Sequence, residues 1–396
     1  MKKITPAMTF IILLGIASLF SDMTHEGAAS IRGAYLAILG ASAGTIGFIS
    51  VLGELVGYSL RLWVGKLTDR TRKYWTFTIV GYVIDVFSVP LLALVGEHGW
   101  MAACALLVLE RTGKAIKKPA KNTILSFAAS QGGVGKGFAL QEALDQIGAF
   151  LGPVLLYLIM LFKSEAEVYR TYARCFAVLA VPAFVTLLVL LYARKKFPNP
   201  ERFESETGSA GAFKSSSAFW IYLAAIGFFA FGFIDFSLIT MHALKTAILS
   251  PQALPLLYAG AMLVDAVAAL WFGWLFDRHG FRVLMVSTVL AAGFVPCVFG
   301  FRSLSLTWAG SILWGIGMGA QESILKAAVA GMVPKASRAS GYGIFECAFG
   351  VCWFLGSWLT GVLYDISLPL MIGVSMAAQL MAVPLFYLAA ARQSRQ

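Results

Sequence analysis

Long apolar runs separated by short polar segments are the dominant pattern of this sequence. Each run is about 20 residues or longer, which is enough for a helix to cross the hydrocarbon core of a membrane. The runs are too long and too uninterrupted for the alternating strands of a membrane β-barrel. The pattern predicts an all-α polytopic membrane protein with twelve spans at 8–32, 43–65, 74–96, 100–127, 136–162, 171–193, 218–244, 253–275, 282–300, 305–331, 338–363 and 367–391.

One long hydrophilic stretch divides the predicted spans six and six. Residues 194–217 contain a Pro-Asn-Pro turn followed by a Gly/Ser-rich run, which is typical of a flexible linker. We therefore expect an N-terminal six-helix bundle over 1–193, a cytoplasmic linker over 194–217 and a C-terminal six-helix bundle over 218–396.

Composition excludes several classes of protein. Hydrophobic residues make up 59% and charged residues only 13% of the chain, too apolar a balance for a soluble globular protein. The net charge of +11 comes largely from short loops between apolar runs, which indicates membrane topology and not nucleic-acid binding. The loop charges predict a multi-pass protein of the cell (inner) membrane with both termini cytoplasmic. The motifs of ATPases, zinc proteases and serine hydrolases are missing from the sequence, so we expect no enzyme activity, cofactor or metal.

The two halves of the sequence repeat one another. The segment Gly65-Lys-Leu-Thr-Asp69-Arg70 returns as Gly273-Trp-Leu-Phe-Asp277-Arg278, at an offset of about 208 residues. Glu142 of the fifth span has a counterpart in Glu346 of the eleventh. These repeats indicate that the two bundles are related by pseudo-symmetry.

The repeated loop resembles the signature of the major facilitator superfamily of secondary transporters, a Gly-x-Leu-x-Asp-Arg-x-Gly-x-(Arg/Lys) pattern after the second and eighth spans. The second copy fits fully, whereas the first has Arg72 in place of the second glycine. The resemblance implies a twelve-helix fold that works by alternating access, with the loops latching the halves together. A carboxylate just past a helix end could also accept backbone N–H bonds from a neighbouring helix. The residues to which we assign gating are Gly65, Asp69, Arg70, Gly273, Asp277 and Arg278.

A further segment, Gly148-x-x-x-Gly152-Pro153 in the fifth span, is similar to the glycine-proline motif of the antiporter branch of that superfamily. This similarity predicts export. Close packing of the span against another helix is the alternative interpretation, because Gly-x-x-x-Gly is common in such contacts.

Ionisable residues inside the predicted spans are the candidates for function. A charge at the bilayer centre costs about 2.5–3.5 kcal/mol, so such groups face protein or water. Arg111, Lys114, Lys118 and Lys121 recur at i, i+3, i+7 and i+10, which places them on one stripe of a helix. In the superfamily, spans one, four, seven and ten line the central cavity. We assign solute binding to Arg111, Lys114, Lys118, His242, Glu322 and Lys326.

Structural ion pairs are the alternative interpretation of these charges. Counting from the turn near Gly132 pairs Lys121 with Glu142, and Lys118 with Asp145. Lys117, Lys118 and Lys121 could also extend toward the cytoplasmic interface. Arg111 in turn has possible partners in Asp22 and Glu110.

Asp22 and Asp235 occupy comparable places near the middle of spans one and seven. The protonation of a carboxylate there depends on nearby cations or solute, which is a means of coupling transport to a proton gradient. We assign proton coupling to Asp22, His25, Glu26, Glu142, Asp235 and Glu346. The sequence thus predicts a proton-driven exporter of a small polar solute, anionic or zwitterionic, that acts as a monomer in contact with membrane lipid. The alternative is a transporter-like protein that moves lipid between leaflets or acts as a sensor.

Overall fold

The computed structural model describes residues 5–132, 134–162, 168–203, 216–320 and 338–393, together with Leu325, Ala328, Val329 and Met332. At some positions inside these ranges only the backbone is described. Gly65, Asp69, Glu142 and Asp277 are among them, while Glu322 and Lys326 lie outside the described residues altogether.

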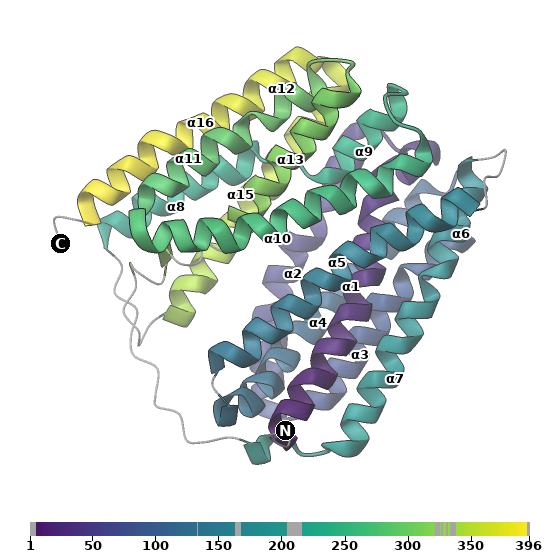
Figure 1. The fold of residues 1–396 in the computed structure, drawn as a ribbon, viewed down its shortest axis with the longest axis vertical. Helices are drawn as coiled ribbons and strands as arrows, with labels where there is room; N and C mark the ends of the chain where they lie inside the picture. The colour runs from purple at the N-terminus through teal and green to yellow at the C-terminus, as the bar shows by residue number, and fades with distance from the viewer. Residues whose placement is uncertain are drawn as a thin grey trace. The chain divides into compact units, whose positions relative to one another are not determined.

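The described chain is a succession of helices (Figure 1). In chain order they are α1 (Pro6–Ile38), α2 (Ala43–Thr71), α3 (Tyr74–Ser88), η1 (Pro90–Leu94), α4 (Trp100–Gly132), α5 (Val134–Phe162), α6 (Val168–Val178), α7 (Ala180–Lys196), η2 (Pro200–Phe203), α8 (Ser217–Gly232), α9 (Phe236–Lys245), η3 (Pro251–Ala253), α10 (Leu254–His279), α11 (Phe281–Ala292), α12 (Phe294–Phe299), α13 (Leu304–Ala320), α15 (Arg338–Ile366) and α16 (Leu368–Gln393).

Hydropathy located the helices well. Among the described residues, nine helical segments are long and apolar enough to cross a membrane, and each coincides with a predicted span. Two more predicted spans correspond to α2 and α4, and the predicted span 305–331 begins with α13. The helices often run past the predicted bounds by one or two turns, because their ends carry polar residues that a hydropathy window excludes.

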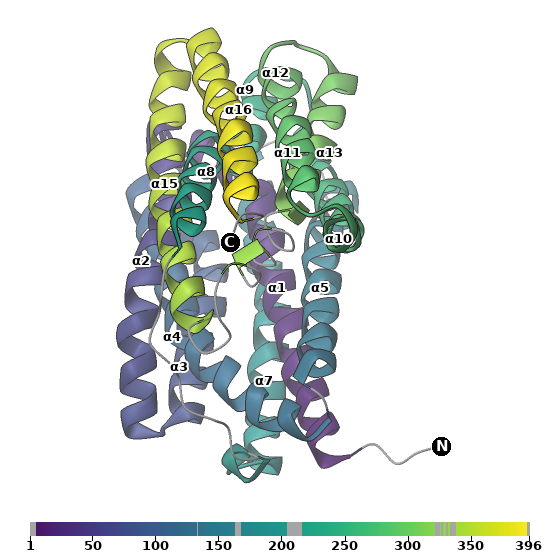
Figure 2. The ribbon, with the colours of Figure 1, turned by 90° about the vertical axis from the view of Figure 1, so that its left-hand side faces the viewer.

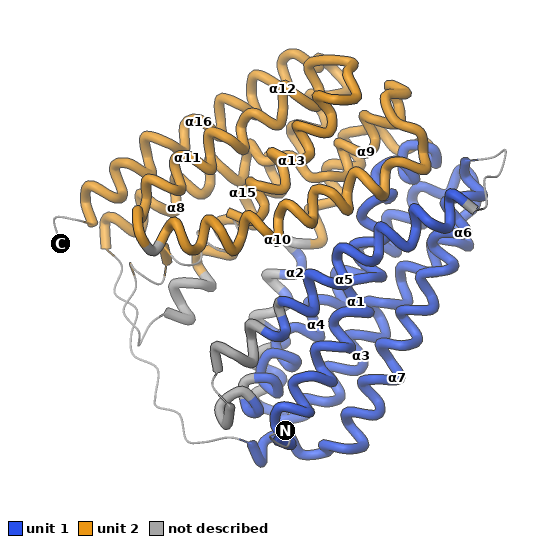
Figure 3. Tube along the Cα trace, in the orientation of Figure 1, with its two compact units in different colours: residues 1–39, 56–207 blue, residues 40–55, 208–396 orange. Residues whose placement is uncertain are grey.

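The chain divides into two compact units, residues 1–39 with 56–207 and residues 40–55 with 208–396 (Figure 3). The first turns of α2 belong to unit 2, where Gly44 N donates to the Asp365 carboxylate over 3.1 Å. The Phe48 ring packs on Phe354 and Trp358, with centroids 5.3 and 5.9 Å away. One helix therefore contributes to both units.

Unit 1 is built around α1, which contacts α4, α5 and α7. Small side chains bring α5 close to α1. A Cβ added at Gly148 would lie 2.2 Å from Leu19 O, and one added at Gly152 would lie 2.3 Å from Met23 O. The Gly-x-x-x-Gly segment is therefore required by helix packing, which is the alternative that the sequence left open.

We expect Gly152→Leu to destabilise the protein by at least about 2–3 kcal/mol, because the added side chain meets backbone atoms that cannot move aside. The matched control is Gly373→Leu in α16, since a Cβ at Gly373 meets nothing within 4 Å. Melting temperatures of the two purified variants test this. Equal losses in both would show that the α1–α5 contact adapts to bulk.

In unit 2, α16 lies beside α8 and α11, as the two perpendicular views agree (Figures 1 and 2). The α8–α16 contact is again close, because a Cβ at Gly232 would lie 2.5 Å from Ser375 O. This places the end of α8 against the middle of α16.

The two signature loops share a positive φ at one matching position. Gly280 has φ +58°, and Arg72, which occupies the matching place in the first copy, has φ +54°. The second glycine of the pattern thus reflects a left-handed residue between two helices, a conformation that glycine adopts readily and arginine does not.

The predicted position of the latch carboxylates is wrong. Asp69 and Asp277 were expected just past a helix end, yet α2 continues to Thr71 and α10 to His279, so both lie in a last helical turn. A carboxylate is unfavourable beside the C-terminal end of the helix dipole unless other donors meet it. Arg70 and Arg278 are exposed in the same turns, and the Arg278 guanidinium lies 3.9 Å from the Trp274 ring centroid.

The first part of the expected linker is packed against unit 1. The chain remains helical to Lys196, and the rings of Phe197 and Phe203 lie 5.3 and 5.9 Å from that of Phe10 in α1. The start of the hydrophilic stretch therefore forms part of the unit 1 surface.

Candidate functional site

The candidate site begins with a close approach of α3 and α4. A Cβ added at Gly113 would lie 2.4 Å from Asp85 N, and one added at Gly81 would lie 2.5 Å from Lys117 N. In each helix a charged residue, Asp85 or Lys117, follows its glycine by one turn. Two glycines therefore bring a carboxylate and an ammonium group together inside unit 1.

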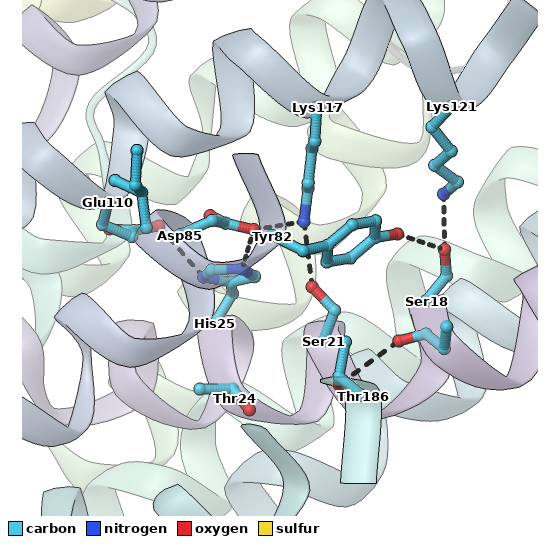
Figure 4. A network of polar contacts seen from close by, with 12 residues as sticks. Ser18, Ser21, Thr24, His25, Tyr82, Asp85, Glu110, Lys117, Lys121 and Thr186 are labelled. Atoms are coloured by element: carbon cyan, nitrogen blue, oxygen red, sulfur yellow. Dashed lines mark hydrogen bonds and ion pairs between the residues drawn. The ribbon is translucent and has the colours of Figure 1, made fainter. Parts of the chain in front are cut away.

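Lys117 and Asp85 form a buried ion pair (Figure 4). Lys117 Nζ donates to Asp85 Oδ2 and, over 2.9 Å, to Ser21 Oγ of α1. The same ammonium lies 4.0 Å from the centroid of the Tyr82 ring. The side chains of Lys117 and Asp85 are 8% and 0% exposed, so the pair is shielded from solvent and lipid alike.

His25 of α1 lies between two carboxylates. Its Nε2 is 3.0 Å from Asp85 Oδ2, and its Nδ1 is 3.1 Å from Glu110 Oε1. A neutral imidazole carries hydrogen on one nitrogen only, whereas the imidazolium carries it on both. Each nitrogen of His25 lies within ion-pair distance of a carboxylate, although neither makes a hydrogen bond of good geometry to the described residues.

The three side chains also have the composition of a metal site. His25, Asp85 and Glu110 each offer a ligand atom, and these atoms lie within 4.8 Å of one another. Both carboxylates, however, already have a cation, since Lys117 bonds Asp85 and Arg111 Nε lies 3.8 Å from Glu110 Oε1. With the two negative charges balanced, one added proton is electrostatically less costly than a divalent ion.

A second ion pair extends the cluster along α4 toward α5. Lys121 Nζ donates to Ser18 Oγ, which lies 3.2 Å from the Tyr82 hydroxyl. The same nitrogen is 3.9 Å from Asp145 Oδ2. The predicted partner of Lys121, Glu142, has no described side chain.

The sequence offered Lys118 as the partner of Asp145, and the structure places Lys121 beside it. The position of the turn accounts for this pairing. The helix α4 ends at Gly132 and α5 begins at Val134, so Lys121 lies 11 residues before one end (132 − 121) and Asp145 11 residues after the other (145 − 134).

The four cations of the predicted stripe on α4 lie in different environments. The side chains of Arg111 and Lys121 are 16% and 12% exposed and have carboxylate neighbours. Lys114 is half-buried, and Lys118 is exposed. The Arg111–Glu110 contact corresponds to one of the two pairings that the sequence left open.

Asp22 and Glu26 lie on α1, directly after the cluster residues Ser21 and His25 respectively, and both are half-buried. Asp22 interacts electrostatically with Lys114, Lys117, Lys121 and Asp145. It therefore belongs to the same group of charges as the two ion pairs.

Asp235, predicted inside a continuous span, instead caps a helix. The chain leaves helical conformation after Gly232 and re-enters it at Phe236, and the Asp235 carboxylate accepts from Ser237 N over 2.9 Å. This is a typical N-cap interaction. Asp235 therefore lies at the start of a helix, whereas Asp22 lies inside α1.

Side chains of three helices satisfy the carbonyl groups freed by this break. Gly232 O accepts from Ser375 Oγ and Gln379 Nε2, over 2.5 and 3.0 Å. Phe233 O and Ile234 O accept from the indoles of Trp353 and Trp314, each over 2.9 Å. A break at membrane depth is tolerated when protein donors replace the lost helical bonds.

Three other residues with predicted roles, His242, Glu346 and Gly273, lie in unit 2. His242 is buried, and its Nδ1 lies 2.8 Å from the Tyr364 hydroxyl, beside the Phe299 ring. Glu346 is half-buried on α15, and Gly273 lies within α10. All three belong to unit 2, whereas the charged cluster belongs to unit 1.

Sequence reasoning placed none of Asp85, Glu110 and Lys117 among the solute-binding or proton-coupling residues, although they form the centre of the cluster. It offered Glu110 only as a partner of Arg111, and Lys117 only as a structural or interfacial charge. A usable signal was present, because Gly81 precedes Asp85 and Gly113 precedes Lys117 by four residues each. A small residue one turn before an intramembrane charge marks a place where two helices approach closely enough to pair that charge.

Comparison with known proteins gives matches along the whole chain. The family model described as the Major Facilitator Superfamily matches residues 7–249 and 239–396. An uncharacterised protein of Mycobacterium tuberculosis is 37% identical over 388 residues, which cover 96% of this chain and 93% of that protein. An uncharacterised transporter of the major facilitator type from Methanocaldococcus jannaschii is 27% identical over 367 residues, covering 90% of this chain and 89% of that one.

Solved structures share the fold. A bacterial homologue of the human lysosomal transporter Spinster, inward-facing and unoccupied, superposes with a TM-score of 0.71 at 13% identity, over 99% of this chain and 97% of that one. A mutant of the peptide transporter POT, in complex with sulfate, gives a TM-score of 0.73 at 15% identity, over 97% and 95% of the two chains.

Proposed function

Because this chain belongs to the major facilitator superfamily, we propose that it is a secondary active transporter that couples protons to the movement of a small polar solute, anionic or zwitterionic. The observation that carries the proposal is His25, held between Asp85 and Glu110 beside the Lys117 ion pair. Buried charges of this kind are costly in a membrane, and transporters use them as proton and solute sites.

The balance of charge in the cluster explains how proton binding and solute binding are coupled. The ionisable groups of the cluster and of the positions next to it are Asp22, His25, Glu26 and Arg32 on α1, Asp85 on α3, Glu110, Arg111, Lys114, Lys117 and Lys121 on α4, and Asp145 on α5. Their five carboxylates and five cations balance when His25 is neutral. A proton that adds to the cluster leaves an excess positive charge in a medium of low dielectric constant. An anionic group bound at Arg111 and Lys114 offsets that excess, so proton and solute favour each other's binding.

The direction of transport follows from the solute's charge. An anion that binds together with the proton is taken up along the proton gradient, whereas export requires a solute that competes with the proton. The packing role of Gly148 and Gly152 accounts for the antiporter-like segment without reference to direction.

Lipid movement between leaflets is the second candidate. It is favoured by an apolar cavity of about 510 Å³ in unit 2, lined by residues of α8, α15 and α16 that include Phe228, Phe231, Cys352 and Met381. An acyl chain fits such a lining, but the charged cluster of unit 1 has no role in this function.

Reconstitution into vesicles separates the two candidates. We expect an imposed pH gradient to drive accumulation of an anionic or zwitterionic solute, found by screening for stabilisation of the purified protein. Labelled phospholipid in the same vesicles reports scrambling. Lipid scrambling with no solute-dependent proton movement across the screen would contradict the proposal.

Asp22→Asn is expected to abolish uphill accumulation and to leave solute exchange at equilibrium intact, because it removes a titrating group while conserving shape. Glu97→Gln, which neutralises an exposed loop carboxylate, is the control. Both activities are measured in the same vesicles. Retained uphill transport in Asp22→Asn would assign coupling to another carboxylate, with Glu142 and Glu346 as the next candidates.

A further inference from the structure

A polar cavity of about 250 Å³ lies where α3 begins and α7 ends, and unit 1 alone forms it. Its lining includes the cations Arg72, Lys73 and Arg194 and the carboxylate of Glu201. Three positive charges and one negative leave an excess of two positive charges around one small space. An anion bound in this space would offset the excess positive charge.

The chain after α7, which lines the cavity together with the start of α3, is held in place by contacts with unit 1. Trp75 Nε1 donates to Phe197 O over 3.0 Å, and the Phe10 ring packs edge-on against the Trp75 ring at 5.9 Å. These contacts fix the chain after α7, so Asn199 and Glu201 line the cavity in a defined position. The site therefore does not depend on the hydrophilic residues beyond 203.

Arg72 holds its place against a backbone preference. Its φ of +54° is left-handed, and glycine takes the matching position at Gly280 in unit 2. An arginine at such a position is disfavoured unless its side chain contributes something. Here Arg72 is one of the lining residues, and the planar fork of a guanidinium suits two oxygens of one anionic group.

The start of α3 adds to the attraction. Lys73 is the N-cap residue and makes no capping bond with its side chain. The first N–H groups of a helix have no partner within that helix, and they favour a negative charge nearby. The backbone and the three cations therefore act on the same space.

We propose that this cavity binds a phosphate group, carried by the headgroup of an anionic membrane phospholipid. The position supports this choice, because the ends of membrane-spanning helices lie at the level of the headgroups, where clustered Lys and Arg bind acidic lipid. Free inorganic phosphate has the same chemistry and is the other source that the test distinguishes. This proposal is independent of the transported solute.

The test compares two pairs of substitutions in the full chain. Lys73→Gln with Arg194→Gln removes two cavity cations, and Lys195→Gln with Lys196→Gln removes two charges from the same end of α7 without touching the lining. Phosphatidylglycerol binding to the purified protein is measured by native mass spectrometry and by the rise in melting temperature. We expect the first pair to weaken binding at least about tenfold and the second less than about twofold.

Arg72→Gly supplies a second readout. It should raise the melting temperature without lipid, because glycine accepts the left-handed backbone, and still weaken phosphatidylglycerol binding. Inorganic phosphate is titrated in parallel, and a cavity-dependent response to phosphate alone would identify the free anion as the ligand. Equal weakening by both pairs, or no weakening by either, would overturn the site.

Discussion

Lys117→Met is expected to destabilise the protein by about 3–5 kcal/mol, because it leaves the buried Asp85 carboxylate without its cation. The side chain of Asp85 is fully buried, and one of its oxygens, Oδ1, has no hydrogen-bond partner among the described residues. Loss of the ammonium would leave the other oxygen with His25 alone. Reversible unfolding of the purified protein in mixed micelles measures the loss.

A double-mutant cycle separates the pair from the packing of the lysine chain. Lys117→Met with Asp85→Leu should recover most of the stability, since two apolar side chains replace two buried charges. Lys118→Met is the matched control on the same helix, and we expect a loss below about 1 kcal/mol because Lys118 is exposed. A full-length Lys117→Met protein as stable as the parent would show that water or lipid reaches Asp85.

The sequence predicted the helices because membrane insertion depends on length and apolar composition, both of which are local. It did not predict the break between α8 and α9. Phe233 and Ile234 continue the apolar run, and no proline stands between Gly232 and Asp235. Donors from α13, α15 and α16 stabilise the break, and such donors are set by tertiary structure.

The sequence predicted which ionisable residues lie in the membrane, but not which of them pair with one another. Hydropathy places the ionisable residues in the membrane, but pairing depends on how each helix is rotated and staggered against the next. A shift of between one and two residues in the centre of the turn between α4 and α5 is enough to change the expected partner of Lys121 from Glu142 to Asp145. Lys117 was missed because it lies off the stripe of α4 that the periodicity emphasises, while Gly81 and Gly113 determine its surroundings.

Arg111→Lys is expected to weaken binding of an anionic solute by about 1.5–3 kcal/mol, or roughly 10- to 150-fold, because lysine cannot reproduce the two-pronged donation of a guanidinium. Arg111 is suited to this role because its side chain is partly exposed, at 16%. Its Nε also lies 3.8 Å from Glu110 Oε1. Lys114→Gln should weaken the same anion and spare a neutral analogue. Equilibrium binding of solute to the purified variants measures both effects.

The contact with Glu110 defines the competing explanation, in which Arg111 only balances a buried carboxylate. Under that explanation Arg111→Gln and Glu110→Gln each lower the melting temperature, and the double variant restores it with solute affinity unchanged. Under ours the double variant remains deficient in binding, because the donor to the solute is gone whatever happens to Glu110. Lys118 was assigned to solute binding from the sequence, but its side chain is exposed, so Lys118→Gln controls for the loss of one positive charge. It should alter neither stability nor affinity by more than about 0.5 kcal/mol.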